Sequence, residues 1–231
     1  MSRRKIQYLV IPPESDAEYV AQMEDVLDTY AKPYNEAHPV ICMDEQPVQL
    51  IKETRLPQPE TKTQPQRVDY EYERAGTASI FMFTEPLSGW RTAHARTRRT
   101  KVDWAEEMAT LLDERYAHCE QITLVSDNLN THTKGAFYEA FEPERARELV
   151  RRLQFCYTPK HGSWLNIAES ELSALTRQCL KGRRIGDLDT LRQEIAAWST
   201  DVNTRQRGVD WQMQINDARY KLKSVYPKIK L

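Results

Sequence analysis

Three acidic residues are surrounded by sequence that suits phosphoryl-transfer chemistry. Asp44 (in PVICMDEQ) and Asp127 (in ITLVSDNLNTH) each follow a short β-branched run, which predicts a carboxylate at the carboxyl end of a buried strand. Glu169 lies in an amphipathic helix that follows the loop TPKHG. Hard divalent cations prefer oxygen ligands, and a pair of ions can activate an attacking oxygen and stabilise a leaving one. The three acids therefore indicate a site for two Mg²⁺ or Mn²⁺ ions.

Hydrophobic periodicity predicts the elements that must position these acids. Capping signals place helix starts at the Ser15–Glu18 box, at the Thr100–Asp103 box, at Asn130 and at Pro143. The predicted strands are residues 39–44, 76–86, 89–99, 121–127 and 153–159. The predicted helices include residues 16–31, a helix from Thr100, residues 163–180 and a last helix from about Asp187.

This order of elements predicts an α/β fold, a five-stranded mixed sheet with helices on both faces. In such sheets, sites form beyond the carboxyl ends of the strands. The helical period puts Glu169 at the edge of the buried stripe, next to the core and able to reach a cleft.

Composition sets modest bounds on the protein class. The 231 residues are 40% hydrophobic and 29% charged, with a mean hydropathy of −0.72, which favours one soluble domain with extensions. No apolar run is long enough to span a bilayer, and the four cysteines show no CxxC spacing. We therefore expect a cytoplasmic chain with reduced thiols and no membrane partner.

The net charge is −1, but basic residues cluster locally. The segment 201–231 carries seven Lys/Arg against three Asp, and we expect residues 205–231 to form a basic tail. Positive patches attract phosphate backbones, although such runs can also be solvated helix ends. The predicted DNA contacts are Arg96, Arg98, Arg99, Lys181, Arg183, Arg184 and, in the loop before the Glu169 helix, Lys160 and His161.

The motifs VSDNLNTHT and YTPKHGSWLNIAE, with MDEQPVQL, RTKVDW and DARYKLKSVYP, resemble the bacterial insertion-sequence branch of the mariner-like DDE transposases. The resemblance covers essentially the whole chain. It implies a ribonuclease H-like fold, Asp44, Asp127 and Glu169 as the metal-binding triad, transposon-end and target DNA as partners, and a homodimer in the active complex. Family members normally begin with a helix-turn-helix region that reads the element ends, and we expect none here.

The expected domains are a helical extension (1–35), a catalytic domain (36–204) with an exposed insertion (53–76), and the basic tail. The function that the resemblance implies is metal-dependent DNA strand cleavage and strand transfer during transposition. A non-catalytic, transposase-derived DNA-binding or assembly protein and a stand-alone ribonuclease H-like nuclease remain alternatives. Near the acids, we expect a structural or hydrogen-bonding role for Glu45, solvent exposure for Glu171, packing rather than catalysis for His132, and a core or loop anchor at Trp164.

Overall fold

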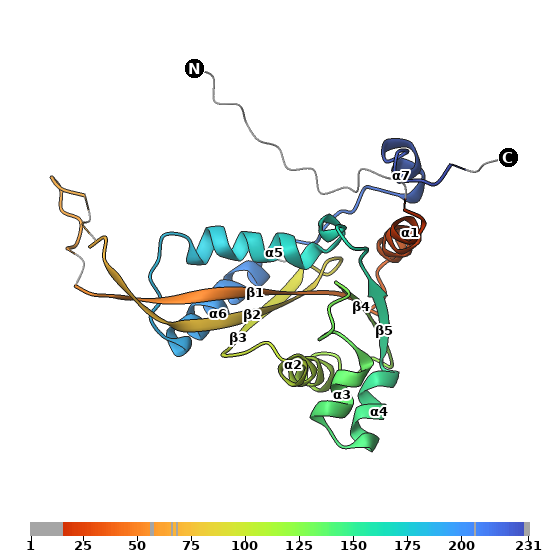
Figure 1. Cartoon of the computed structure of the whole chain (residues 1–231), viewed down its shortest axis with the longest axis horizontal. Helices are drawn as coiled ribbons and strands as arrows, with labels where there is room; N and C mark the ends of the chain where they lie inside the picture. Colours follow the sequence, from red (N-terminus) through yellow and green to blue (C-terminus); the bar gives the residue numbers. More distant parts are fainter. Residues whose placement is uncertain (1–15, 56–57, 66, 68, 206, 229–231) are drawn as a thin grey trace.

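The computed structural model describes residues 16–55, 58–65, 67, 69–205 and 207–228 (Figure 1). The strands are β1 (Val40–Glu53), β2 (Tyr72–Glu85), β3 (Trp90–Arg96), β4 (Ile122–Ser126) and β5 (Leu153–Tyr157). The helices are α1 (Ala17–Ala31), α2 (Lys101–Asp113), α3 (Lys134–Ala140), α4 (Pro143–Arg151), α5 (Ile167–Leu175), α6 (Leu188–Thr204) and α7 (Ile215–Lys221).

The strands form one mixed sheet in the order β3-β2-β1-β4-β5. The first three pair antiparallel, whereas β1, β4 and β5 run parallel. The expected α/β fold with a five-stranded mixed sheet is confirmed.

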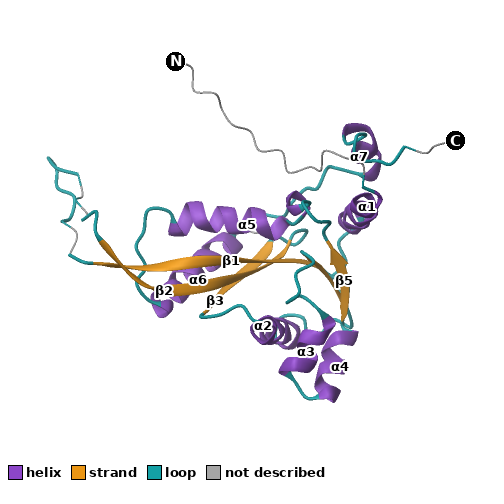
Figure 2. Ribbon diagram, viewed as in Figure 1, coloured by secondary structure: helices purple, strands orange, loops and turns teal. Residues whose placement is uncertain are grey.

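Each face of the sheet carries its own hydrophobic core. Side chains alternate along a strand, so Cys42 of β1 packs with α1, α5 and α6, while its neighbour Met43 packs with α2, α3 and α4. Figure 2 shows α5 on one side of the strands and α2, α3 and α4 on the other. Helices therefore cover both faces, as the order of elements predicts.

The first two strands are longer than expected. The prediction that the first strand ends at Asp44 is wrong: β1 continues to Glu53, paired with β2 as far as Tyr72. Its pairing with β4 stops at Cys42, so the later part of β1 has one strand neighbour. Pro47, which has no N–H to donate, is tolerated in this one-sided stretch. Residues 72–76 are therefore strand rather than excursion, and the β1–β2 hairpin projects from the body of the molecule (Figure 1).

The helix starts match the capping signals in part. The Thr100 capping box is present, and Pro143 occupies the first turn of α4. At α1 the cap is Asp16, whose side chain accepts the N–H groups of Glu18 and Tyr19, while the expected Ser15 lies outside the described residues. The prediction that Asn130 caps the next helix is wrong, because α3 starts after Thr133.

The predicted helix 163–180 is three segments in the structure. A 3-10 turn (Ser163–Leu165) comes first, then α5, then a π-helical segment (Thr176–Leu180). Asn166, between the first two segments, accepts the N–H of Ala168 and caps α5. The catalytic candidate Glu169 therefore lies in the first turn of a short helix with its own cap.

The basic segment near the carboxyl end is packed against the domain. Val209 donates its N–H to Pro86 O (2.7 Å), and the Trp211 ring lies 4.8 Å from that of Tyr30. The sequence does not predict α7, which follows, and Arg219 binds both carboxylate oxygens of Glu24 on α1 at 2.9 and 3.0 Å. Residues 207–228, called the strap below, thus pack across the fold. None of the described helices combines the length and apolar character needed to cross a lipid bilayer.

Candidate active site

Asp44 and Asp127 lie at the same level on two neighbouring strands. The last pair of the parallel β1–β4 register is Cys42 with Val125, and each aspartate comes two residues later. Asp127 directly follows Ser126, the last residue of β4. The end of β4 therefore brings Asp127 beside Asp44, where β1 loses its parallel neighbour.

Glu169 is brought to the same place by the start of α5. The Asn166 side-chain amide donates to Met43 O at 2.9 Å, one residue before Asp44. Glu169 N–H in turn donates to Asn166 O at 3.1 Å. The preceding residue, Leu165, is held through its carbonyl by the hydroxyl of Tyr30 at 2.7 Å. These bonds fix the first turn of α5 against β1, with Glu169 exposed.

The electrostatics of Asp44 show that the three acids influence one another. Burial raises the pKa of Asp44 from its ordinary 3.8 to about 6, and the negative charges of Asp127 and Glu169 act in the same direction. The Glu45 N–H, 2.7 Å from Asp44 Oδ1, and the charge of His132 oppose this rise in pKa. Without a cation, the ionised form of Asp44 is thus disfavoured by burial and by two like charges.

His132 joins Asp127 to Glu45. Its Nδ1 lies 2.7 Å from Asp127 Oδ1 and its Nε2 lies 3.0 Å from Glu45 Oε1. Burial alone would lower the pKa of His132, but the hydrogen bonds and charges of the two carboxylates outweigh burial and raise this pKa to about 9. At neutral pH both ring nitrogens therefore donate, one to each carboxylate.

The sequence predicts the roles of Glu45 and His132 only in part. Glu45 has the expected hydrogen-bonding role, and His132 is buried as expected, but its contact with Asp127 was not foreseen. The motif DNLNTH holds the only sequence signal, a histidine five residues after the aspartate.

The donor set at this site suits a hard divalent cation. All three candidate ligands are carboxylates, and a cation would offset the burial and the neighbouring negative charges that raise the pKa of Asp44. Among the described residues, no three His, Cys, Asp or Glu side chains are gathered tightly enough to hold an ion as they lie. The chemistry of the three side chains therefore fits a divalent cation.

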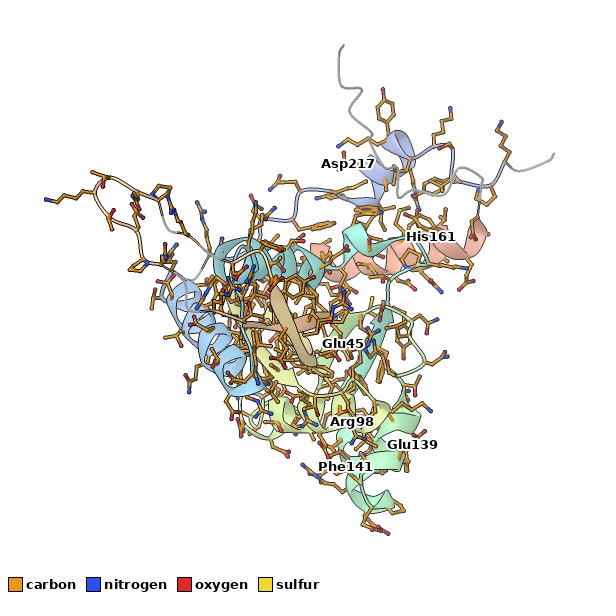
Figure 3. The ribbon with its side chains drawn as sticks, turned by 60° about the vertical axis from the view of Figure 1, so that its left-hand side comes forward. Glu45, Arg98, Glu139, Phe141, His161 and Asp217 are labelled. Atoms are coloured by element: carbon orange, nitrogen blue, oxygen red, sulfur yellow. The ribbon has the colours of Figure 1, made fainter. Side chains whose placement is uncertain are left out.

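A cavity of about 670 Å³ opens beside Asp127 and is lined by Lys160 and His161. The turn that carries them is closed by a bond from Gly162 N–H to Pro159 O (2.8 Å), and His161 has a φ of 65°, which non-glycine residues rarely adopt. A Cβ on Gly162 would lie 2.5 Å from Pro159 Cγ, so this turn requires glycine. Figure 3 shows His161 in this loop, with Glu45 toward the middle of the molecule.

Several basic residues predicted to contact DNA are engaged inside the protein. Arg96 pairs with Asp103, Glu106 and Glu107. Arg183 pairs with Glu194, and Arg184 with Glu53. Their contact with DNA stays a prediction, but these ion pairs reduce the positive charge that each residue offers.

The other predicted contacts, Arg98, Arg99, Lys181, Lys160 and His161, are exposed. Arg99 also lines a smaller cavity of about 360 Å³ together with Glu45 and Asn128. The Lys160 loop therefore opens onto a cavity that Asp127 lines, and Arg99 opens onto one that the next residue, Asn128, lines.

The expectation that Glu171 faces solvent is wrong. Its carboxylate lies 3.0 Å from the Nε of buried Arg91, as an ion pair without good hydrogen-bond geometry. Burial raises the pKa of Glu171, and the charge of Arg91 opposes that rise. This pair joins α5 to the β3 edge of the sheet and is separate from the acidic site.

The five-stranded mixed sheet with helices on both faces has a ribonuclease H-like fold. Residues 39–192 match the family model described as DDE superfamily endonuclease, and this range includes all three acids. The chain belongs to this family. No curated protein matches the sequence.

Solved structures with the same fold include the Mos1 mariner paired end complexes. The complex with Mg has a TM-score of 0.59 at 13% identity, covering 98% of this chain and 68% of that one. The complex with Mn has a TM-score of 0.57 at 13% identity, covering 96% of this chain and 65% of that one. The Mos1 strand transfer complex gives 0.54 at 12% identity, covering 86% and 58%. This chain thus spans 58% to 68% of the length of these Mos1 chains.

Proposed function

We propose that this chain is the catalytic domain of a DNA transposase that cuts DNA strands and transfers the freed ends to a target. The observation that supports this function most is that β1, the end of β4 and the first turn of α5 lie next to one another, so that the charges of Asp127 and Glu169 act on Asp44, in a chain of the DDE endonuclease family. The three carboxylates would hold divalent cations, Mg²⁺ or Mn²⁺.

The three acids lie on different elements and differ in how freely they can move. Asp44 sits on a strand paired on one side with β2, and Asp127 leaves the end of β4. Glu169 is exposed on the first turn of α5 and can move toward a bound cation more easily than the two aspartates. Two bound cations would activate the attacking oxygen and stabilise the leaving oxygen of an in-line displacement. No covalent link between protein and DNA is needed for this chemistry.

The proposed partner is DNA, both the element ends and the target. The Mos1 structures with this fold are described as paired end and strand transfer complexes, the former with Mn or Mg. By analogy, two copies of this chain would act together on paired ends. The exposed groups next to the acids, Lys160, His161 and Arg99, would contact the DNA backbone.

The experiment is nicking of supercoiled plasmid DNA by the purified chain with MgCl₂, with MnCl₂ or with EDTA. We expect metal-dependent nicking by the wild type and none by Asp127→Asn, with both proteins equally folded. DNA binding without nicking by the wild type would instead support a non-catalytic DNA-binding role. Nicking that persists in EDTA or in the variant would contradict carboxylate-held metal catalysis.

A further inference from the structure

We propose that Glu45 and His132 are positioning residues that hold Asp127 in the orientation needed to bind a divalent cation. The inference rests on the proposed function. The contacts that carry it are the bond from His132 Nδ1 to Asp127 Oδ1 (2.7 Å) and the bond from His132 Nε2 to Glu45 Oε1 (3.0 Å).

Asp127 needs such support because the sheet does not provide it. It lies just beyond the last residue of β4, and its side chain is 39% exposed. A carboxylate in that position is free to rotate unless another group holds it. With Oδ1 bonded to His132, Oδ2 remains available for a ligand. Hydrogen bonds of this kind to metal-binding carboxylates fix the direction of their lone pairs.

The histidine is itself held firmly. Its side chain is 0% exposed, and its ring lies 5.5 Å from the ring of Trp104 on α2. Its backbone carbonyl accepts the hydroxyl of Tyr157 at 2.9 Å. Glu45, with a side chain only 2% exposed, holds the far nitrogen of the ring. His132 is therefore held at its ring face, at both ring nitrogens and at its backbone carbonyl, as a rigid support requires.

One strand would thus arrange two of the three acids. Successive residues of β1 point to opposite faces of the sheet, so Asp44 faces the α5 side while Glu45 faces the α2 side. Asp44 contributes its own carboxylate, and Glu45 acts on Asp127 through His132. The adjacent acids in MDEQ would therefore have different tasks, one binding the cation and one positioning a ligand.

Two variants of His132 separate its two bonds. In His132→Asn the amide nitrogen falls near the place of Nδ1, so the bond to Asp127 is kept and the bond to Glu45 is lost. In His132→Gln the amide nitrogen falls near the place of Nε2, so the reverse holds. Both variants remove the ring, so packing against Trp104 is disturbed in each. His94→Gln is the control, because His94 makes a similar bond, 2.6 Å to Glu107, away from the acids.

The measurement is titration calorimetry of each folded protein with MnCl₂, with urea unfolding to record stability. We expect the Mn²⁺ affinity to fall in the order wild type, His132→Asn, His132→Gln, with the last weakened about 10-fold or more. His94→Gln should lose stability and keep the wild-type Mn²⁺ affinity. Should His132→Gln fail to fold, the comparison of His132→Asn with the wild type still tests the support from Glu45.

The outcomes distinguish this inference from the proposed function. Mn²⁺ binding that is lost in Asp127→Asn but unchanged in both His132 variants would overturn the positioning role alone. Mn²⁺ binding that is the same in the wild type and in Asp127→Asn would remove Asp127 as a ligand and overturn both. The expected order of affinities, with plasmid nicking reduced in the same order, supports both.

Discussion

Replacing Asp44 with Asn should stabilise the metal-free protein at neutral pH. In the unfolded chain Asp44 ionises at its ordinary pKa of 3.8, whereas burial and the charges of Asp127 and Glu169 raise that pKa to about 6 in the folded protein. For an acid with a raised folded pKa, the wild type loses stability as the pH rises from about 4 to about 7. Asp44→Asn escapes this loss, and its amide oxygen can still accept the Glu45 N–H.

The size of the effect follows from the two pKa values. A change from 3.8 to about 6 corresponds to about 3 kcal/mol if it is fully expressed. Asp44 is partly exposed, and solvent reduces this value, so we expect about 1–2 kcal/mol. This is a measurable fraction of the stability of an ordinary domain.

The assay is urea unfolding of both proteins in EDTA at pH 4 and at pH 7.5. The variant should gain stability over the wild type between the two pH values. Asp28→Asn, at an exposed position on α1, should show no such pH-dependent gain. Adding MgCl₂ at pH 7.5 should stabilise the wild type and leave Asp44→Asn nearly unchanged, because only the wild type keeps all three ligands. Equal stabilities at pH 7.5 in EDTA would refute the reasoning that burial and the neighbouring acids disfavour the ionised form of Asp44.

Three further predictions follow from the structure. Arg99→Glu should weaken binding to duplex DNA more than Arg183→Glu does, because the charge of Arg183 is already paired with a carboxylate. Fluorescence anisotropy over a salt series measures the two affinities, and equal losses of affinity would contradict the prediction. Burial raises the pKa of Glu107, but its partners His94 and Arg96 outweigh burial and lower this pKa below 4.5. The stability advantage of the wild type over Glu107→Gln, measured by urea unfolding, should therefore be complete near pH 7 and shrink below pH 4.5. Trp211→Ala should cost about 3 kcal/mol in the same assay, because its ring packs against the rings of Tyr30 and Trp164, and an unchanged midpoint would show that the strap is not packed.

The end of β4 and the helix that carries Glu169 can be predicted from the sequence because their signals are local. A β-branched run followed by Asp marks where β4 ends, and hydrophobic periodicity places Glu169 on its helix. The first strand was predicted too short, since the acidic and proline residues at 44–47 look like a turn. The alternation of Val48 and Leu50 beyond them was the signal for continuation.

What the sequence could not predict depends on contacts between distant residues. Glu45 and His132 are 87 residues apart, so no local pattern links them. The strap is held by Trp211, whose partners Tyr30 and Trp164 lie far away in the chain, and its residues before α7 have no helical or strand period. Charge clusters are visible in sequence, but the carboxylates that neutralise them come from other elements.

The distribution of free and paired charge narrows the surface that DNA can use. In the strap, Arg219 is bound to Glu24, and near the π-helical segment Arg183 is bound to Glu194, so neither site offers its full charge to a phosphate. Exposed Lys160, on the loop before α5, lines a cavity together with Asp127, and exposed Arg99, on the loop before α2, lines a second cavity together with Glu45. Each lines a cavity that includes Asn128, the residue after the catalytic candidate. Phosphate contacts position a nucleic acid without reading its sequence. We therefore expect a DNA strand to be held between these two loops, which would place a phosphate against the carboxylates, with little preference for base sequence.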